Sequence, residues 1–289
     1  MDQIRENAYA KLNISLDVNE KRPDGYHNMT MVMQSISLCD ELLLEKTGTG
    51  EIRFRCNLPF IPSDERNLAV RAALRYLEAV GASGQGLRME LNKRIPVGAG
   101  MAGGSTDAAA VLRAMNRLYG GALSPAELET LAAAVGSDVP FCVRGGTALA
   151  TGRGECLESL PSMPDCAFLV CKPDFSISTP ELFRKLDQSS LRCHPDTAGI
   201  LEALRCGDLG RICRRMYNVF EDVDDRRMRT VQEIKGRLLD CGALGAIMTG
   251  TGSAVFGVFA PGAVPAGAAD ALRRDYGFCE EAVCVDRLL

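Results

Sequence analysis

Four glycines between residues 96 and 107 belong to the segment whose residue types and spacing are best suited to chemistry. This segment is Pro96-Val-Gly-Ala-Gly-Met-Ala-Gly-Gly-Ser-Thr-Asp107, and the apolar run after it is expected to begin a helix. Glycine lacks the Cβ atom that keeps a bulky polyanion away from backbone N–H groups, and a helix N-terminus offers unpaired donors. Ser105 and Thr106 add hydroxyls within reach of a phosphate oxygen or its magnesium ion. We therefore predict a phosphate-binding loop.

Other interpretations of this loop fit less well. Its first three glycines have the spacing of the dinucleotide fingerprint, but that motif follows an apolar strand and needs an acid about 20 residues later. Here the loop follows Asn-Lys-Arg-Ile at 92–95, and residues 120–124 are Gly-Gly-Ala-Leu-Ser. A Walker loop needs a lysine after its last glycine, and none follows Gly104. A plain glycine-rich turn explains one or two glycines, but not four with Ser-Thr-Asp after them.

A strand before the loop carries two polar residues side by side. Residues 8–18 alternate in polarity, so we expect a strand whose even-numbered, apolar side chains all face one core. Lys11 and Asn13 then share its other face, where solvent exposure is the simpler interpretation of the strand alone. Residues 19–25 have the composition of a turn, and a returning strand is expected over 29–38.

Two further places combine a reactive side chain with a defined backbone. Tyr26 and His27 lie where the expected turn meets the returning strand, and they offer a stacking face and a hydrogen-bonding ring. Asp138 lies between Gly136 and Pro140, which fixes a bend beside apolar surface. An ordinary Asx-turn explains this aspartate equally well. For an isolated histidine, a satisfied or exposed side chain without a chemical role is the simpler interpretation.

The rest of the pattern predicts a mixture of helices and strands. We expect strands over 42–54, 87–91 and 167–172, helices over 63–80, 108–119 and 125–135, mostly helix over 198–240, and a second glycine-rich loop running into a strand over 244–259. The helix over 125–135 has a capping box at Ser124 and Glu127. His194 falls in a polar linker, where we expect no function.

The composition is that of an ordinary globular protein. The chain has 289 residues, of which 46% are hydrophobic and 24% charged, with a formal net charge of −4. This balance argues against a general nucleic-acid or membrane surface, and no apolar run approaches the roughly 18 residues of a membrane span. Because the N-terminus has no basic, apolar leader, we expect a cytoplasmic protein. The 12 cysteines are scattered and are expected to be buried reduced thiols.

The glycine loop as a whole resembles the ATP loop of the GHMP kinase superfamily, which includes galactokinase, homoserine kinase, mevalonate kinase and phosphomevalonate kinase. Other stretches narrow this resemblance to the 4-diphosphocytidyl-2-C-methyl-D-erythritol kinase family. Those that resemble the family's opening are Ala10-Lys-Leu-Asn-Ile-Ser-Leu16, Arg22-Pro-Asp-Gly-Tyr-His27 and Met33-Gln-Ser-Ile-Ser-Leu-Cys-Asp-Glu41. Gly136-Ser-Asp-Val-Pro-Phe141 and segment 145–155 resemble its segment with the catalytic aspartate. The matches lie between residues 8 and 259, and none is claimed for 260–289.

The resemblance implies an α+β fold of two domains. These are an N-terminal ATP-binding domain over 1–160 and a C-terminal substrate domain over 161–289, with the active site between them. ATP and Mg²⁺ are the implied cofactors. The implied partner of this monomer or weak homodimer is a small-molecule cytidyl diphosphate substrate, with no nucleic acid and no membrane. The implied reaction phosphorylates the 2-hydroxyl of 4-diphosphocytidyl-2-C-methyl-D-erythritol in the non-mevalonate route to isoprenoid precursors.

The resemblance also implies roles for particular residues. Asp138 is expected to accept the proton of the substrate hydroxyl, and Lys11 to stabilise the resulting oxygen and keep Asp138 ionised. The implied substrate contacts are Asn13, Tyr26, His27, Thr179 and Phe183. The implied ATP contacts are Asn67, Lys93, Pro96, Val97, Gly98, Ala99, Gly100, Met101, Ala102, Gly103, Gly104, Ser105 and Thr106. Residues 250–253 of the second glycine-rich loop would support the phosphates, and the magnesium ligand stays unassigned.

Simpler roles remain open for several of these residues. Asn67 serves equally well as a helix cap, Lys93 as a solvated lysine and Thr179 as the cap before Pro180. For the whole chain, the alternatives are a sister kinase acting on homoserine or a mevalonate-type substrate, and a nucleotide-binding regulator of this fold without turnover. The presence of both a lysine and an aspartate at the matching positions disfavours the regulator.

Overall fold

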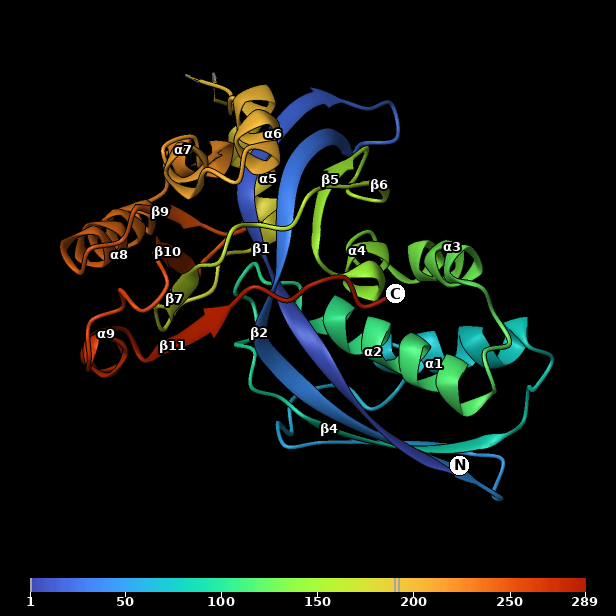
Figure 1. The fold of residues 1–289 in the computed structure, drawn as a ribbon. Coiled ribbons are helices and arrows are strands. Elements are labelled where there is room, and N and C mark those ends of the chain that lie inside the picture. Colours follow the sequence, from blue (N-terminus) through green and yellow to red (C-terminus); the bar gives the residue numbers. More distant parts are fainter. Residues whose placement is uncertain (1, 190, 192) are drawn as a thin grey trace.

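Two β-sheets organise the structure, which confirms the expected α+β fold of two units (Figure 1). The computed structural model describes residues 2–189, 191 and 193–289. The first part contains β1 Gln3–Lys21, β2 His27–Thr47, β3 Ile52–Cys56, α1 Leu68–Ala79, β4 Gly86–Asn92, α2 Gly103–Leu118, α3 Pro125–Val135, α4 Val139–Arg144, β5 Thr147–Thr151 and β6 Cys156–Ser159. The second part contains β7 Ala167–Lys172, α5 Thr179–Leu186, α6 Thr197–Arg205, α7 Leu209–Cys213, β8 Tyr217–Asn218, the 3-10 helix η1 Val219–Asp222, α8 Met228–Asp240, β9 Gly245–Met248, β10 Val255–Phe259, α9 Ala268–Tyr276 and β11 Phe278–Val283.

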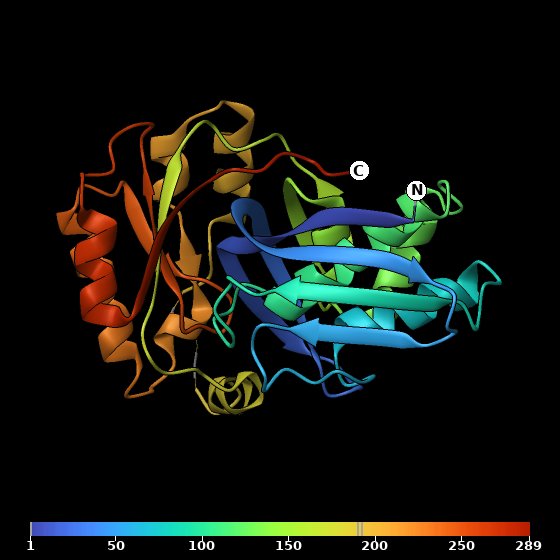
Figure 2. The same cartoon turned by 90° about the horizontal axis from the view of Figure 1, so that it is seen from below.

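The long hairpin of β1 and β2 forms the centre of the first sheet. Its antiparallel register runs from Gln3 opposite Glu45 to Lys21 opposite His27. The strand order is β3-β4-β2-β1-β8, and β5 pairs with both β2 and β6. The helices of the first part lie on one side of this sheet, and α2 packs against β1 and β2 (Figure 2). The glycine loop that precedes α2 is thereby held beside the middle of the hairpin.

The apolar side chains of β1 divide between two cores, so the prediction that they all face one core is wrong. The core cluster shared with α1 and α2 contains Ala8, Leu16 and Val18. The cluster shared with β7 and β10 contains Ala10, Leu12 and Ile14. The register against β2 shifts between Tyr9 and Lys11 and again between Asn13 and Ser15. Because a bulge adds a residue to one strand only, the side chains after it point to the opposite face.

The polar side chains in the middle of β1 are buried, which overturns the interpretation that Lys11 and Asn13 are solvated. Lys11 is 4% exposed and Asn13 is fully buried. Ser15, the next residue in this row, is also fully buried. Polar groups in such positions need partners, because unpaired burial is costly. The middle of β1 therefore lies in the interior between the two sheets, with a lysine among its buried residues.

The helices mostly follow the predicted boundaries. Asn67 caps α1 by accepting a hydrogen bond from the Ala69 N–H, and the capping box before α3 is present. Helix α2 begins at Gly103, earlier than predicted, so Ser105 to Asp107 belong to the helix rather than to the loop before it. Helix α4, which begins immediately after Asp138, was not predicted.

The second sheet is antiparallel in the order β11-β7-β10-β9. Strand β7 has the predicted boundaries, and the region over 198–240 is mostly helical, as predicted. Strand β8 interrupts that region and pairs in parallel with β1, with Tyr217 opposite Ser15. His194, from the predicted polar linker, lies 2.8 Å from the Asp17 carboxylate through its Nδ1. The second part of the chain thus contacts β1 at several points.

The C-terminal residues return to the first sheet after β11. Cys284 forms a β-bridge with Ile36, and Arg287 forms one with Gly145. The Val285 N–H also donates to the Ser35 carbonyl over 2.9 Å. In Figure 1 this segment is the red coil that continues from β11 to the C-terminus, near α4. No structure had been predicted for residues 260–289.

The described part of the chain has two further global features. None of its helices combines the length and apolar character needed to cross a bilayer. All 12 cysteines are free. Cys156, Cys193 and Cys206 are exposed, so the prediction that the cysteines are buried is wrong for these three.

Candidate active site

Two cavities lie on either side of the glycine loop. The smaller cavity, of about 360 Å³, is bordered by the loop and by the start of α1. The larger cavity, of about 610 Å³, lies between β1, β2, the start of α4 and the second part of the chain. Gly98, Gly100 and Ala102 line both cavities. The loop is therefore the wall that the two cavities share.

The structure brings most of the predicted residues to these cavities. All the predicted ATP contacts except Thr106 line the smaller cavity, namely Asn67, Lys93 and Pro96 to Ser105. All the predicted catalytic and substrate residues except Asn13 line the larger one, namely Lys11, Tyr26, His27, Asp138, Thr179 and Phe183. Thr106 is buried, and its hydroxyl donates to the Gly103 carbonyl over 2.8 Å. Asn13 is buried behind Lys11.

The glycine loop is fixed by contacts with both halves of the molecule. The Lys11 N–H donates to the Met101 carbonyl over 3.3 Å, and the Ala254 N–H donates to the Ala99 carbonyl over 3.1 Å. Gly100 has a φ of +76°, and a Cβ atom there would lie 2.1 Å from the Thr249 carbonyl oxygen. Because only glycine allows this approach, the loop packs directly against the second glycine-rich loop.

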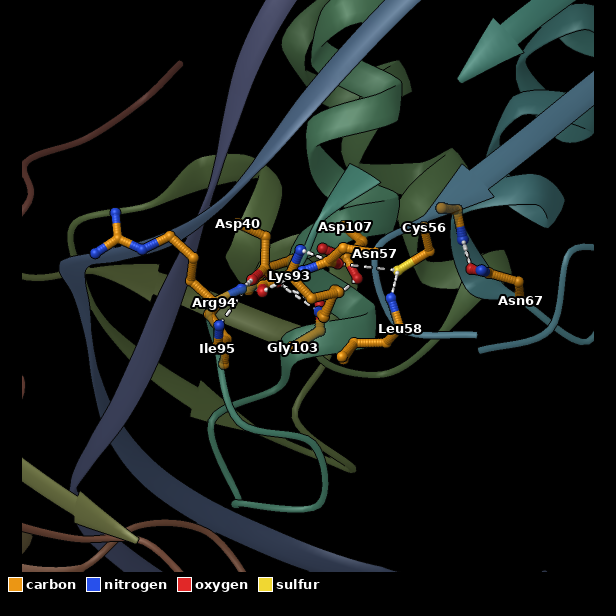
Figure 3. A network of polar contacts seen from close by, with 12 residues as sticks. Asp40, Cys56, Asn57, Leu58, Asn67, Lys93, Arg94, Ile95, Gly103 and Asp107 are labelled. Carbon is orange, nitrogen blue, oxygen red and sulfur yellow. Dashed lines mark hydrogen bonds and ion pairs between the residues drawn. The ribbon is translucent and has the colours of Figure 1, made fainter. Parts of the chain in front are cut away.

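A buried ion cluster fixes the residues that lead into the glycine loop (Figure 3). The Lys93 Nζ lies 2.7 Å from an oxygen of Asp107 and also contacts Asp40. The other oxygen of Asp40 accepts hydrogen bonds from the N–H groups of Arg94 and Ile95, at 2.5 and 2.7 Å. Lys93 is only 9% exposed, so the interpretation of a solvated lysine is wrong.

This cluster contains one positive charge for two carboxylates. Asp40 has three hydrogen-bond donors, whereas Asp107 has only Lys93, and the Asp107 Oδ1 is buried without a partner. Burial raises the pKa of Asp107 to about 8, with the charge of Asp40 adding to the rise and Lys93 opposing it. The folded protein therefore holds a proton on Asp107 at pH values where an exposed aspartate is ionised.

Stability is consequently expected to fall as the pH rises from the unfolded pKa of Asp107 to its folded pKa. The carboxyl titrates at about 3.8 when unfolded and at about 8 when folded, so the folded state binds the extra proton between these values. The free energy of unfolding should decrease with a slope of up to about 1.4 kcal/mol per pH unit. Denaturant unfolding from pH 5 to 8 measures this slope. Asp107→Asn should flatten it, and parallel curves for the two proteins would contradict the assignment.

The Lys11 and Asp138 side chains meet the larger cavity from different elements. The Lys11 Nζ donates to the Asn13 Oδ1 over 2.6 Å, which orients the ammonium group from behind. Asp138 is the N-cap residue of α4, but its side chain makes no capping hydrogen bond. Among the hydrogen bonds of the described residues, none involves its carboxylate. The Asx-turn interpretation is therefore wrong, and the carboxylate is available to a ligand.

Aromatic and polar side chains gather at the other end of the larger cavity. The rings of His27 and Phe183 are stacked with their centroids 5.0 Å apart. The His27 Nε2 lies 2.7 Å from an oxygen of Asp187, and Lys21 contacts the second oxygen at 2.5 Å. These contacts, first the one with Lys21, lower the pKa of Asp187. Tyr26 is 57% exposed beside them, so its ring is accessible for stacking.

Thr179 joins the second glycine-rich loop rather than capping a helix. The N-cap residue of α5 is Ser178, so the cap interpretation of Thr179 is wrong. The Thr179 hydroxyl lies 2.8 Å from that of Thr251, which also lines the larger cavity. Gly250 and Gly252 line it too, whereas Ser253 is buried and its hydroxyl donates to the Phe175 carbonyl.

Several residues of the larger cavity were not predicted. Asp187 and Met31 carry no sequence signal, because each acts only through a partner that is distant in the chain. Arg153 lines the cavity from the turn between β5 and β6. Its position between Gly152 and Gly154 is a signal that could have drawn attention to it. No group of three or more His, Cys, Asp or Glu side chains in the described residues is placed to hold a metal ion.

Comparison with known proteins agrees with this arrangement. The model of the GHMP kinase N-terminal domain matches residues 67–146, and that of the GHMP kinase C-terminal domain matches residues 200–277. The first match contains the glycine loop and Asp138, and the second contains the second glycine-rich loop. The fold and the site therefore define an enzyme of the GHMP kinase class, whose members use ATP.

Individual relatives narrow the class further. A 4-diphosphocytidyl-2-C-methyl-D-erythritol kinase of Lachnospira eligens is 42% identical over 259 residues, which cover 90% of each chain. One from Listeria monocytogenes serotype 4a is 42% identical over 283 residues, covering 98% of this chain and 96% of the relative. A crystal structure of 4-(cytidine 5'-diphospho)-2C-methyl-D-erythritol kinase is 35% identical with a TM-score of 0.81, over 97% of this chain and 99% of that one. The chain belongs to the 4-diphosphocytidyl-2-C-methyl-D-erythritol kinase family.

Proposed function

We propose that this enzyme transfers the γ-phosphoryl group of ATP to the 2-hydroxyl of 4-diphosphocytidyl-2-C-methyl-D-erythritol, in the non-mevalonate route to isoprenoid precursors. The observation that carries the proposal is the shared wall of the two cavities. One cavity borders the glycine loop and the start of α2, and the other contains Lys11 and Asp138. Phosphoryl transfer requires a nucleotide and an acceptor hydroxyl on opposite sides of one phosphoryl group.

ATP is proposed to occupy the smaller cavity with its phosphates at the N-terminus of α2. The N-cap residue Ala102 has a left-handed backbone and makes no side-chain capping bond, so the first N–H groups of this 16-residue helix are available to an anion. Mg²⁺ bound with ATP supplies positive charge to the phosphates. Ser105 is the hydroxyl at this helix end that would hold the ion, together with oxygens of ATP and water.

Asp138 is proposed as the base and Lys11 as the group that stabilises charge. The carboxylate accepts the proton of the substrate 2-hydroxyl as the oxygen forms its bond to the γ-phosphorus and the bond to ADP breaks. The ammonium group of Lys11 stabilises negative charge on the attacking oxygen. Their place in one cavity supports these roles, as does the contact that orients Lys11 through Asn13.

Comparing acceptors tests the proposed reaction. ADP release is measured with purified enzyme, ATP and Mg²⁺, with the cytidyl diphosphate substrate, homoserine or mevalonate as acceptor. Turnover is expected with the cytidyl substrate alone. Release of ADP with homoserine or mevalonate in its place would assign the chain to a sister kinase. ATP binding without turnover of any of the three would support a regulator.

The cytosine is proposed to lie between Tyr26 and the stacked pair of His27 and Phe183. Base–aromatic stacking is worth about 1–3 kcal/mol per base. Tyr26→Ala should therefore raise KM for the cytidyl substrate about 5- to 150-fold and leave KM for ATP unchanged. Tyr26→Phe keeps the ring and is the matched control. Equal KM values for the alanine and phenylalanine variants would show that the Tyr26 ring does not contribute to substrate binding.

We also propose the domain boundary at residues 160 and 161. The last strand that the chain adds to the first sheet before the second sheet begins is β6, which ends at Ser159. The first strand of the second sheet begins at Ala167. Proteolysis that yields a fragment ending near residue 160 would support the boundary.

A further inference from the structure

Arg153 occupies the turn between β5 and β6, at the side of the larger cavity. The neighbouring Gly152 and Gly154 have φ values of +70° and +114°, which glycine adopts without strain. The Gly152 carbonyl accepts a hydrogen bond from the Met29 N–H over 2.7 Å, so the turn is attached to the start of β2. The Arg153 side chain is 37% exposed and lines the cavity. Its backbone is therefore held in place while its head group can meet a ligand.

The turn lies between the two functional ends of this cavity. The guanidinium carbon of Arg153 is 5.2 Å from the centre of the Tyr26 ring, at the aromatic end. On its other side, a Cβ atom on Gly154 would lie 3.6 Å from the Asp138 Oδ1. A ligand that extends from the stacking residues to Asp138 therefore passes Arg153.

The guanidinium also has unused hydrogen-bonding capacity. Its Nε forms an ion pair with Glu155 over 3.5 Å but makes no hydrogen bond, and none of the hydrogen bonds of the described residues involves its two terminal nitrogens. The other lysine and arginine side chains that line the described part of the cavity donate hydrogen bonds to protein acceptors. Lys11 donates to Asn13, Lys21 to Asp187 and Arg184 to the Pro180 carbonyl.

We propose that Arg153 binds the diphosphate group of the substrate, an inference that rests on the proposed function. The base and the polyol of a cytidyl diphosphate substrate are neutral, so its negative charge lies in the middle of the molecule. The planar guanidinium matches two phosphate oxygens at once, which makes arginine suited to such a group. Arg153 thereby selects a substrate whose two ends are joined by a diphosphate.

Competitive inhibition by cytidine and by CDP tests this role. Both are measured against the cytidyl substrate at saturating ATP, in the wild type, Arg153→Gln and Arg153→Lys. In the glutamine variant, the inhibition constant of CDP is expected to rise about 10- to 100-fold, and that of cytidine should stay unchanged, because only CDP carries phosphate. The lysine variant should recover part of the loss. Arg53→Gln removes another arginine that is paired with a glutamate two residues away, but at an exposed position of β3, and should behave as wild type.

The outcomes separate the proposal from a structural role. If the inhibition constants of cytidine and CDP rise equally, Arg153 only supports Tyr26. If CDP binding is unchanged, Arg153 does not contact the diphosphate. Either result overturns the inference. KM for ATP and the thermal unfolding temperature report whether the variants are folded. If the wild type neither uses the cytidyl substrate nor binds CDP, the proposed function itself fails, which is a distinct result.

Discussion

An Asp138→Asn enzyme is expected to bind both substrates and to turn over about 10²- to 10⁴-fold more slowly than the wild type. The amide keeps the shape of the side chain but cannot accept the proton of the attacking hydroxyl. Because the carboxylate makes no capping bond to α4, its replacement should leave the fold intact. Steady-state ADP release gives kcat and both KM values, and the loss should appear in kcat.

A matched variant separates this effect from a general loss of charge. Asp165→Asn makes the same chemical change at an exposed position between β6 and β7 and should retain wild-type kinetics. If the kcat of the Asp138→Asn enzyme stays within a factor of ten of the wild type, Asp138 is not the base. A raised KM for ATP with unchanged kcat would instead indicate that Asp138 contributes to nucleotide binding.

The second large effect is expected from Gly100→Ala, which should lower the free energy of unfolding by about 2–5 kcal/mol. An alanine at φ +76° costs backbone energy, and its Cβ atom would lie 2.1 Å from the Thr249 carbonyl oxygen. The two glycine-rich loops must then separate, which also displaces the wall between the cavities. Denaturant unfolding measures the first consequence, and a raised KM for ATP measures the second.

Gly120→Ala is the control that measures the cost of placing alanine at a positive φ without a steric contact. Gly120 has nearly the same backbone angle, with φ +73°, but no atom lies within 4 Å of where its Cβ would be. Gly120→Ala should lower the free energy of unfolding only by the backbone cost of about 1–2 kcal/mol and leave KM for ATP unchanged. Equal losses of stability for the two variants would show that the contact between the loops contributes nothing.

The sequence predicted the parts of the fold that depend on local pattern. Strand β7 and the capping box before α3 were found because a short apolar run and a Ser-Pro-x-Glu sequence act within a few residues. The division of β1 between two cores was missed, because a bulge depends on the partner strand and leaves the alternation of the sequence unchanged. The short strand β8 was missed for a related reason, since it pairs with β1, which comes from the start of the chain.

Much of the candidate site was reached through the resemblance rather than through residue patterns. Lys11 and Asp138 are 127 positions apart, and no spacing rule brings them to one cavity. The burial and pairing of Lys93 could not be predicted, because its partner Asp40 is 53 positions away in the chain. Asp187 contacts His27 across 160 positions, so only coordinates reveal the pair.

The C-terminal bridges to Ile36 and Gly145 bear on how the enzyme can change shape. The two halves also share the apolar core of β1, β7 and β10, the pairing of β8 with β1 and the contact between the two glycine-rich loops. The bridges add a last contact, because the chain leaves the first sheet and returns to it at its final residues. Swinging the halves apart would break those bridges. We therefore expect movements during turnover to be confined to the loops that edge the cavities.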